Sequence, residues 1–461
     1  MEPSGIRQQR CSSNHGYRDL KPAPSESIAP PTARSDTRQL VRAIGRGDLT
    51  AFCINAIIGA GIFGLPAVAY ARVGNWSLLA FGVCGLVVML LVLCFAEVSS
   101  RFEATGGPYL YARTAFGPLA GFEVGWLLYI ARLTAFAANI NLLVSYVAWF
   151  WPSASSTGWR EAIIATVVIG LTTINLLGIK GSTLLSNLLT YGKLIPLALL
   201  IGLGLLAMDR PVTPTLPLPK LPEFSASVLL LIYAFSGFEV AAIMGGELKD
   251  PRRDLPKALL TALGVVISFY VLLQLVAIST VADLGNSERP LTDAAMAIIG
   301  PLGAAVISTG AIISILGNLH TTSLVAPRLP FAMAERKELP GFLSEIHPTF
   351  HTPHRAILIT ATLLLIIALS GTFVYAATVS VIARLLTYGV TCAALPVFRR
   401  RRDLPEALFR LPAGNWIVAI ALGVSGWLLT HTSGQEMRDT TLAALAGMAL
   451  YGLSRWRYRS A

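Results

Sequence analysis

The segment GAGIFG, residues 59–64, interrupts an apolar run that otherwise has the composition of a membrane-spanning helix. Its three glycines, with Pro66 close behind, disfavour a continuous helix at this point. Inside a bilayer each unpaired backbone N–H or C=O group costs several kcal/mol, so a break is tolerated only where it is buried in protein or lines a wet cavity. The segment therefore predicts a site where a ligand meets bare backbone groups.

A second apolar run, residues 225–246, is interrupted in a similar way by SGFE at 236–239. Two broken helices at separate places in one chain are typical of transporters built from inverted repeats, whose substrate site lies at the breaks. We therefore expect the first and the sixth membrane spans to be broken and to form one site.

The composition indicates an all-α membrane protein. Of the 461 residues, 54% are hydrophobic and only 13% are charged, whereas soluble domains carry about 25% charged residues. Runs of about 20 apolar residues, long enough to cross a bilayer, recur along the chain and predict about twelve transmembrane helices. The expected spans are 50–72, 78–100, 119–150, 161–178, 183–208, 226–247, 257–281, 301–325, 355–371, 373–397, 415–431 and 439–456.

The distribution of charge predicts the orientation of the chain. Its net charge is +11, and most Lys and Arg residues lie in the N-terminal tail and in every second loop. This asymmetry places both termini in the cytoplasm of a plasma membrane or bacterial inner membrane. We expect residues 1–46 to form a disordered basic tail that contacts anionic lipid. The positive charge therefore indicates lipid rather than nucleic acid as a partner.

The two breaks offer complementary groups to a ligand. A helix that begins after residues 58–62 presents N–H groups and the positive end of its dipole, which suit a carboxylate. A break at residues 233–237 presents carbonyl oxygens, which suit an ammonium group. The simplest ligand that carries both groups is an amino acid.

Four stretches resemble one known family. GAGIFGLPAVAYARVG at 59–74 resembles the first helix of the amino acid–polyamine–organocation (APC) transporters, and FEATGGPYLYARTAFGP at 102–118 resembles the loop between their second and third helices. FSGFEVAAIMGGELKDPRRDLPKAL at 235–259 is similar to their sixth helix and the loop after it. The resemblance continues through GNLHTTSLVAPRLPFAMAERKELP at 317–340 and so covers nearly all of the chain after the tail.

The resemblance implies the LeuT-type fold and alternating access. It implies a first inverted repeat of five helices at 47–208 and a second at 209–397 that includes an external linker. Two further helices and a short cytoplasmic C-terminus then occupy 398–461.

The resemblance also implies which residues bind the substrate. Backbone N–H groups at the first break would hold the carboxylate, carbonyl groups at the second would accept from the ammonium group, and two aromatic side chains would shape or gate the pocket. The implied substrate-binding residues are Ile58, Ala60, Gly61, Ile62, Tyr233, Ala234, Phe235, Ser236 and Phe238.

Two ionisable residues inside spans are the candidates for coupling. Sodium-independent relatives carry a lysine where Lys193 stands, and its ammonium group resembles a substitute for a sodium ion of sodium-coupled relatives. Alternatively, Lys193 extends to lipid phosphates at the membrane surface. Glu239, beside the second break, is expected either in a gate or proton path or as a structural hydrogen-bond acceptor.

Three further polar residues lie within spans. Arg132 and Arg384 either contact the substrate or, as we favour, pair with a carboxylate or with free carbonyl groups. If either arginine lines the pocket, a cationic substrate is disfavoured. His320 has no second histidine at metal-ligand spacing, which favours an interior histidine with satisfied hydrogen bonds.

The sequence predicts a transporter and not an enzyme. It contains no HExxH, GxxxxGK or GxSxG motif, and we expect no catalytic residue, cofactor, metal ion or obligate partner subunit. The predicted function is sodium-independent transport of L-amino acids, by exchange or with protons. The alternatives are a sodium-coupled amino acid symporter, a polyamine carrier and a non-transporting amino-acid sensor of the same fold.

Overall fold

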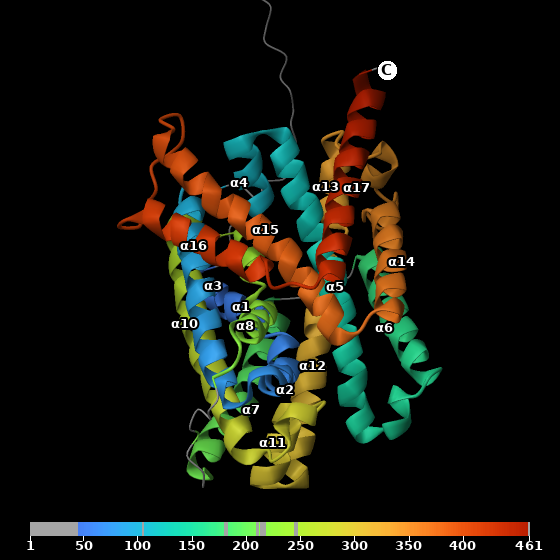
Figure 1. The fold of residues 1–461 in the computed structure, drawn as a ribbon. Coiled ribbons are helices and arrows are strands. Elements are labelled where there is room, and N and C mark those ends of the chain that lie inside the picture. The colour runs from blue at the N-terminus through green and yellow to red at the C-terminus, as the bar shows by residue number, and fades with distance from the viewer. Residues whose placement is uncertain are drawn as a thin grey trace, which may run out of the picture. The chain divides into compact units, whose positions relative to one another are not determined.

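The computed structural model describes residues 45–459 except 104–105, 179–182, 209–211, 213–217 and 244–247. The predicted tail at 1–46 therefore lies almost wholly outside the described residues. Every element within them is a helix (Figure 1), which confirms the all-α class. By length and hydropathy six helical segments could each cross a membrane: Gly61–Ser99, Pro118–Phe150, Trp159–Leu177, Pro251–Thr280, Pro301–Glu335 and Phe373–Arg400.

The helices follow the expected spans in chain order. The α-helices are α1 Arg46–Ile57, α2 Gly61–Val73, α3 Ser77–Ser99, α4 Gly107–Phe116, α5 Pro118–Phe150, α6 Trp159–Leu177, α7 Thr183–Leu206, α8 Leu221–Phe235, α9 Glu239–Ile243, α10 Pro251–Thr280, α11 Pro290–Ile299, α12 Pro301–Val325, α13 Arg328–Glu335, α14 His354–Ser370, α15 Phe373–Arg400, α16 Gly414–Leu429 and α17 Gly434–Arg459. The short 3₁₀ helices are Gly74–Trp76, Pro152–Ser155, Leu284–Asn286 and Gly341–Ser344.

Both predicted helix breaks are present. The first apolar run divides into α1, which ends at Ile57, and α2, which begins at Gly61. The second divides into α8, which ends at Phe235, and α9, which begins at Glu239. Because these interruptions leave backbone groups without intrahelical partners, they mark the part of the fold where a ligand can bind main-chain atoms.

The two breaks lie against each other, and glycine is what allows it. A Cβ atom on Gly61 would lie 2.6 Å from the Ala234 Cα atom. A Cβ atom on Gly237 would lie 2.3 Å from the Ala56 carbonyl oxygen, and Gly237 also has a φ of +113°, which favours glycine. The chain between α8 and α9 can therefore contact the end of α1 only with glycine at this position.

Helices α5 and α15 lie side by side, and α5 also contacts α12, while α3 and α10 contact each other beside the breaks. The most apolar stretch of α5 is 89% buried, so α5 is a central helix. Tyr270 of α10 ties both breaks together, because its hydroxyl donates to the Ala234 carbonyl at 3.0 Å and lies 3.4 Å from the Ile57 carbonyl.

Two short helices occupy segments that we expected to be loops. They are α4, within residues 102–118, and α13, after the eighth span. The Tyr109 hydroxyl of α4 donates to the Glu338 carboxylate at 3.0 Å, and Arg113 pairs with the same carboxylate. Burial and the Glu338 charge raise the pKa of the Tyr109 phenol, which keeps it a donor. The sequence signal was weak because each helix is short and only one face is apolar.

The boundaries of the predicted repeats stay predictions. The boundary after residue 208 adjoins residues outside the described part of the chain. The boundary after residue 397 falls inside α15, which continues to Arg400.

Candidate functional site

A cavity of about 90 Å³ lies between the two breaks. Its walls come from α1, α2, α5, α7, α8, α9, α12, α15 and the segments that join the broken helices. One water molecule needs about 10–15 Å³ of such space, so the cavity has room for a small organic ligand. Five of the predicted site residues line it: Ala60, Gly61, Lys193, Tyr233 and Ser236.

The first break presents backbone donors to this cavity. Within the break, the Gly59 N–H donates to the Ile57 carbonyl, and the Phe63 N–H donates to the Ala60 carbonyl. The N–H groups of Ala60, Gly61 and Ile62 donate none of the hydrogen bonds found among the described residues. These N–H groups stand at the positive end of the α2 dipole and suit an anion.

The second break offers fewer open acceptors than we expected. The Tyr233 carbonyl accepts from the Ser236 hydroxyl at 2.8 Å and from the Ser236 N–H at 3.3 Å. The Ala234 carbonyl accepts from Tyr270, and Ala234 does not line the cavity. Ser236 is therefore the best placed of the three predicted carbonyl groups for a ligand ammonium group.

Lys193 of α7 lines the cavity and forms hydrogen bonds to carbonyl groups at the end of α1. Its side chain is 5% exposed, and its Nζ donates to the Ile58 carbonyl at 2.7 Å and to the Asn55 carbonyl at 3.2 Å. The alternative that Lys193 extends to lipid phosphates is therefore wrong for this conformation. Carbonyl oxygens at a helix C-terminus carry partial negative charge and favour a cation, which the ammonium group supplies.

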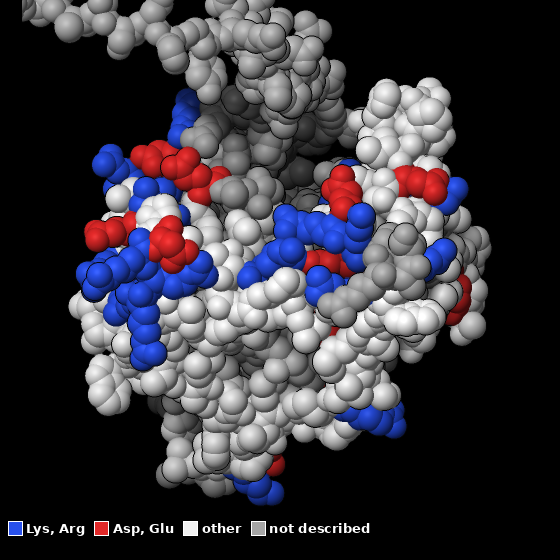
Figure 2. Space-filling view, turned by 90° about the horizontal axis from the view of Figure 1, so that it is seen from above, with Lys and Arg blue, Asp and Glu red and all other residues white. Residues whose placement is uncertain are grey.

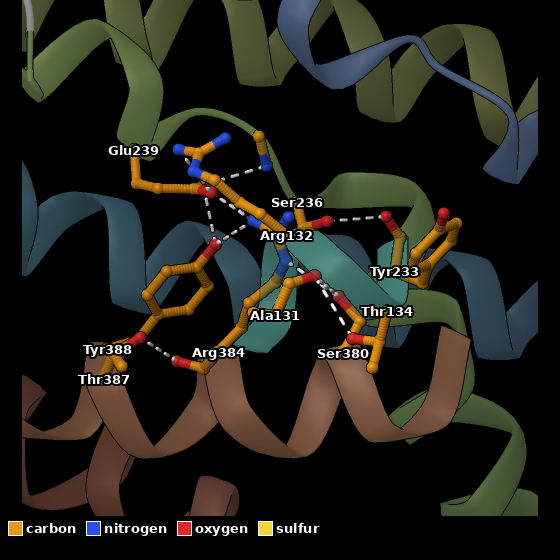
Figure 3. Close-up of polar contacts among 11 residues, drawn as sticks. Ala131, Arg132, Thr134, Tyr233, Ser236, Glu239, Ser380, Arg384, Thr387 and Tyr388 are labelled. Carbon is orange, nitrogen blue, oxygen red and sulfur yellow. Dashed lines mark hydrogen bonds and ion pairs between the residues drawn. The ribbon is translucent and has the colours of Figure 1, made fainter. Parts of the chain in front are cut away.

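Glu239 joins α9 to α15 through its contacts with Arg384 and Tyr388 (Figure 3). It is fully buried and pairs with Arg384, while its Oε2 accepts from the Tyr388 hydroxyl at 2.7 Å and from the Gly237 N–H at 2.9 Å. The favoured pairing of Arg384 with a carboxylate is thus confirmed. Because it is buried, accepts hydrogen bonds from other helices and does not line the cavity, Glu239 matches the expected structural hydrogen-bond acceptor.

Arg132 of α5 lines the same cavity. Its Nη2 lies 3.9 Å from the Glu239 Oε1, too far for a hydrogen bond. Its Nε and Nη2 are buried and have no hydrogen-bond partner among the described residues. Arg384 lines the cavity as well, so both arginines meet the condition that disfavours a cationic substrate.

Several predicted residues lie outside the cavity lining. Phe235 contacts the rings of Phe81 and Tyr270, and Phe238 contacts those of Phe95 and Tyr388, so both aromatic side chains pack behind the wall. The other residues outside the lining are Ile58, whose carbonyl group bonds Lys193, and Ile62, Ala234, Glu239 and His320.

Sequence reasoning missed a polar network that spans three helices. The Tyr233 hydroxyl donates to the Asn139 side chain, whose Nδ2 donates to the Asn318 Oδ1 at 2.7 Å. Both asparagines line the cavity. The available signal was an amide inside an apolar span. Within the described residues no group of His, Cys, Asp and Glu is arranged to hold a metal ion.

The chain is similar to known membrane permeases over most of its length. A family model described as amino acid permease matches residues 44–440. The serine/threonine exchanger SteT of Bacillus subtilis (strain 168) is 30% identical over 420 residues, which cover 87% of this chain and 94% of that protein. The methylthioribose transporter of the same organism is 27% identical, with 92% and 95% covered. The branched-chain amino acid permease BcaP, also of B. subtilis, is 25% identical, with 91% and 94% covered.

These matches run through both helix breaks and nearly all of the described helices. They agree with the long apolar helices of a multi-pass membrane protein. The chain therefore belongs to the amino acid permease family of the APC superfamily, a family of membrane transporters and not of enzymes.

Proposed function

We propose that this permease carries L-amino acids by alternating access without sodium, either by exchange or together with protons. The α-carboxylate binds the N–H groups at the start of α2, and the ammonium group binds the Ser236 carbonyl across the cavity. Lys193 is the coupling residue. The two breaks thus hold the part that all amino acids share, and side chains from α5, α12 and α15 select among them.

The observation that carries the sodium-independent mechanism is the position of the Lys193 ammonium group. It donates to two carbonyl oxygens at the end of α1, the kind of oxygen ligands that a sodium ion would need. Because the Lys193 ammonium group already occupies these carbonyl oxygens, binding of a sodium ion beside it is unfavourable. The exchanger SteT, named for serine/threonine exchange, is a relative that also supports exchange.

The polyamine alternative is disfavoured by charge. Arg132, Lys193 and Arg384 line the cavity, and no carboxylate does among the described residues. A polycation would meet like charges in a site of low dielectric constant, where repulsion is strong.

Counterflow in proteoliposomes tests the proposal directly. Vesicles loaded with a mixture of unlabelled amino acids receive one labelled amino acid at a time, without sodium and at equal pH on both sides. We expect uptake of a subset of L-amino acids, and no increase when sodium is added. If none is taken up with or without sodium, the sensor or another substrate class replaces our proposal; uptake only with sodium supports the symporter.

Lys193→Met is expected to reduce sodium-independent counterflow by about 10- to 100-fold, because the charge-assisted bonds to two carbonyl groups are lost. Lys220→Met is the matched control, since the Lys220 side chain is 82% exposed before α8. Counterflow that stays at the level of this control would contradict a coupling role for Lys193. Activity restored by sodium would identify the lysine as a built-in substitute for that ion.

We further propose that the end of the molecule where α4 and α13 lie faces the cytoplasm. Figure 2 views this end, and Lys and Arg side chains gather on it with acidic side chains among them. The positive-inside rule supports this orientation, and anionic lipid headgroups are the partners that such a face attracts.

A further inference from the structure

We infer that the cavity selects an amino acid with an anionic side chain, and that Arg132 is the residue that recognises this second carboxylate. The inference rests on the proposed function, because it assigns the substrate class of the same cavity. It identifies acidic amino acids as the preferred substrates among those that the backbone groups at the breaks can hold.

The first observation is an imbalance of charge. Three cationic side chains line the cavity: Arg132, Lys193 and Arg384. The carboxylate nearest to them, Glu239, can balance one. Lys193 donates its hydrogen bonds to carbonyl oxygens, which carry only a partial negative charge and do not neutralise the ammonium group. A zwitterionic ligand adds no net charge, whereas an acidic amino acid brings a negative charge into a site with a positive excess.

The second observation separates the two arginines. Arg384 has hydrogen-bond partners for two of its nitrogens: its Nη1 pairs with Glu239 and lies 3.4 Å from the Tyr388 hydroxyl, and its Nε donates to the Ser380 hydroxyl at 3.3 Å. Arg132 is equally buried, at 4% exposed, but its Nε and Nη2 have no hydrogen-bond partner among the described residues. Buried donors without a hydrogen bond are costly, so a ligand that accepts from Nε and Nη2 would be favoured here.

The third observation is that other donors already occupy three of the roughly four acceptor positions of the Glu239 carboxylate. Its Oε1 takes Arg384, and its Oε2 accepts from Tyr388 and from the Gly237 N–H. The gap of 3.9 Å between the Arg132 Nη2 and Oε1 leaves attraction without a hydrogen bond. Glu239 therefore holds Arg132 by charge and leaves its Nε and Nη2 without a hydrogen-bond partner in the described part of the chain. Figure 3 shows Arg132 and Arg384 both reaching toward Glu239.

The chemistry of Arg132 fits a carboxylate. A guanidinium group presents parallel donors that match the two oxygens of a carboxylate. With the α-carboxylate on the N–H groups of Ala60 and Gly61, the side chain of the ligand is left to reach Arg132 on the α5 wall. The volume of about 90 Å³ favours a short acidic side chain over a long one, which selects aspartate before glutamate.

Isosteric competitors test the inference in the unaltered protein. Counterflow is measured with L-aspartate against L-asparagine and with L-glutamate against L-glutamine, each pair differing in charge but hardly in shape. We expect the acidic member to be taken up or to compete about 10- to 100-fold better, as one or two charge-assisted hydrogen bonds would give. Succinate, which lacks the ammonium group, is the third arm and is expected to compete poorly.

Equal or better transport of asparagine and glutamine would overturn the inference and leave the proposed function standing, with Arg132 hydrated or bound to the α-carboxylate. Succinate at the level of aspartate would overturn it in favour of dicarboxylates. If no amino acid in the counterflow panel is transported, the proposed function itself fails. Transport of neutral amino acids in the same panel distinguishes this result from a failure of the acidic preference alone.

Substitutions then assign the preference to Arg132. Arg132→Gln is expected to remove most of the aspartate-over-asparagine preference, and Arg132→Lys to keep part of it, because lysine keeps the charge but not the paired donors. Arg253→Gln is the control for lost charge, since the Arg253 side chain is 69% exposed. A preference that survives in a folded Arg132→Gln protein, with neutral substrates still transported, would overturn the role of Arg132.

Discussion

Glu239→Gln is expected to lower the stability of the permease more than any other single substitution of a polar side chain described above. Removing one member of a buried ion pair costs about 3–5 kcal/mol, because the other charge stays buried without compensation. Here two arginines depend on one carboxylate: Arg384 pairs with it and Arg132 lies 3.9 Å away. The thermal unfolding midpoint of detergent-purified protein measures the effect.

A matched control separates burial from the simple loss of a charge. Glu345 pairs with Arg355 at 2.6 Å, but both side chains are nearly half exposed, and exposed pairs contribute only about 0–1 kcal/mol. Glu345→Gln should therefore leave the midpoint almost unchanged. The double variant Glu239→Gln with Arg384→Gln should recover part of the loss, since no unpaired charge remains on α15. An equal midpoint for the two single variants would contradict a structural role for Glu239.

Gly237→Ala is expected to reduce transport by more than about 10-fold while the rest of the fold remains. Two independent features oppose the added methyl group: the φ of +113°, a conformation that costs a non-glycine residue about 1–3 kcal/mol, and the Ala56 carbonyl oxygen at 2.3 Å. The chain must shift away from α1, and with it the Ser236 carbonyl and the Gly237 N–H that bonds Glu239.

Counterflow of the purified variant at a fixed protein amount measures this loss. Gly264→Ala on α10 is the control, because a Cβ atom there meets nothing within 4 Å and alanine favours a helix over glycine by about 1 kcal/mol. It should be as active as the unaltered protein and slightly more stable. Normal transport by Gly237→Ala would show that the close approach of α1 to the second break is dispensable.

The helix breaks were predictable because their cause is local. Clustered glycines and a proline disfavour a helix wherever they occur. The breaks at residues 59–64 and 236–239 could therefore be predicted without knowing which segments lie beside them. The second role of these glycines, which is to let the two breaks approach each other closely, was not predictable. That Gly61 lies against Ala234, and Gly237 against Ala56, depends on contacts between segments far apart in the chain.

The sequence predicted which kinds of polar residue belong to the candidate site, but not which residues contact one another there. Polar residues inside apolar spans indicated function, and Arg384 was expected to find a carboxylate. That the carboxylate belongs to Glu239, and that the Nε and Nη2 of Arg132 have no hydrogen-bond partner among the described residues, follows from how α5, α9 and α15 are arranged. Asn139 and Asn318 were missed for a related reason: helices that are apolar nearly all round give little sign of which face meets the cavity.

The Tyr270 hydroxyl has a mechanical consequence. It reaches the carbonyl at the end of α1 and donates to the carbonyl near the end of α8, so one phenol on α10 clamps the two broken helices to each other. Any motion that pulled them apart would have to release this clamp inside a dry core. Access to the substrate from alternate sides is therefore easier if α1, α8 and α10 travel as one rigid body and the cavity opens along its other walls, on α5 and α12.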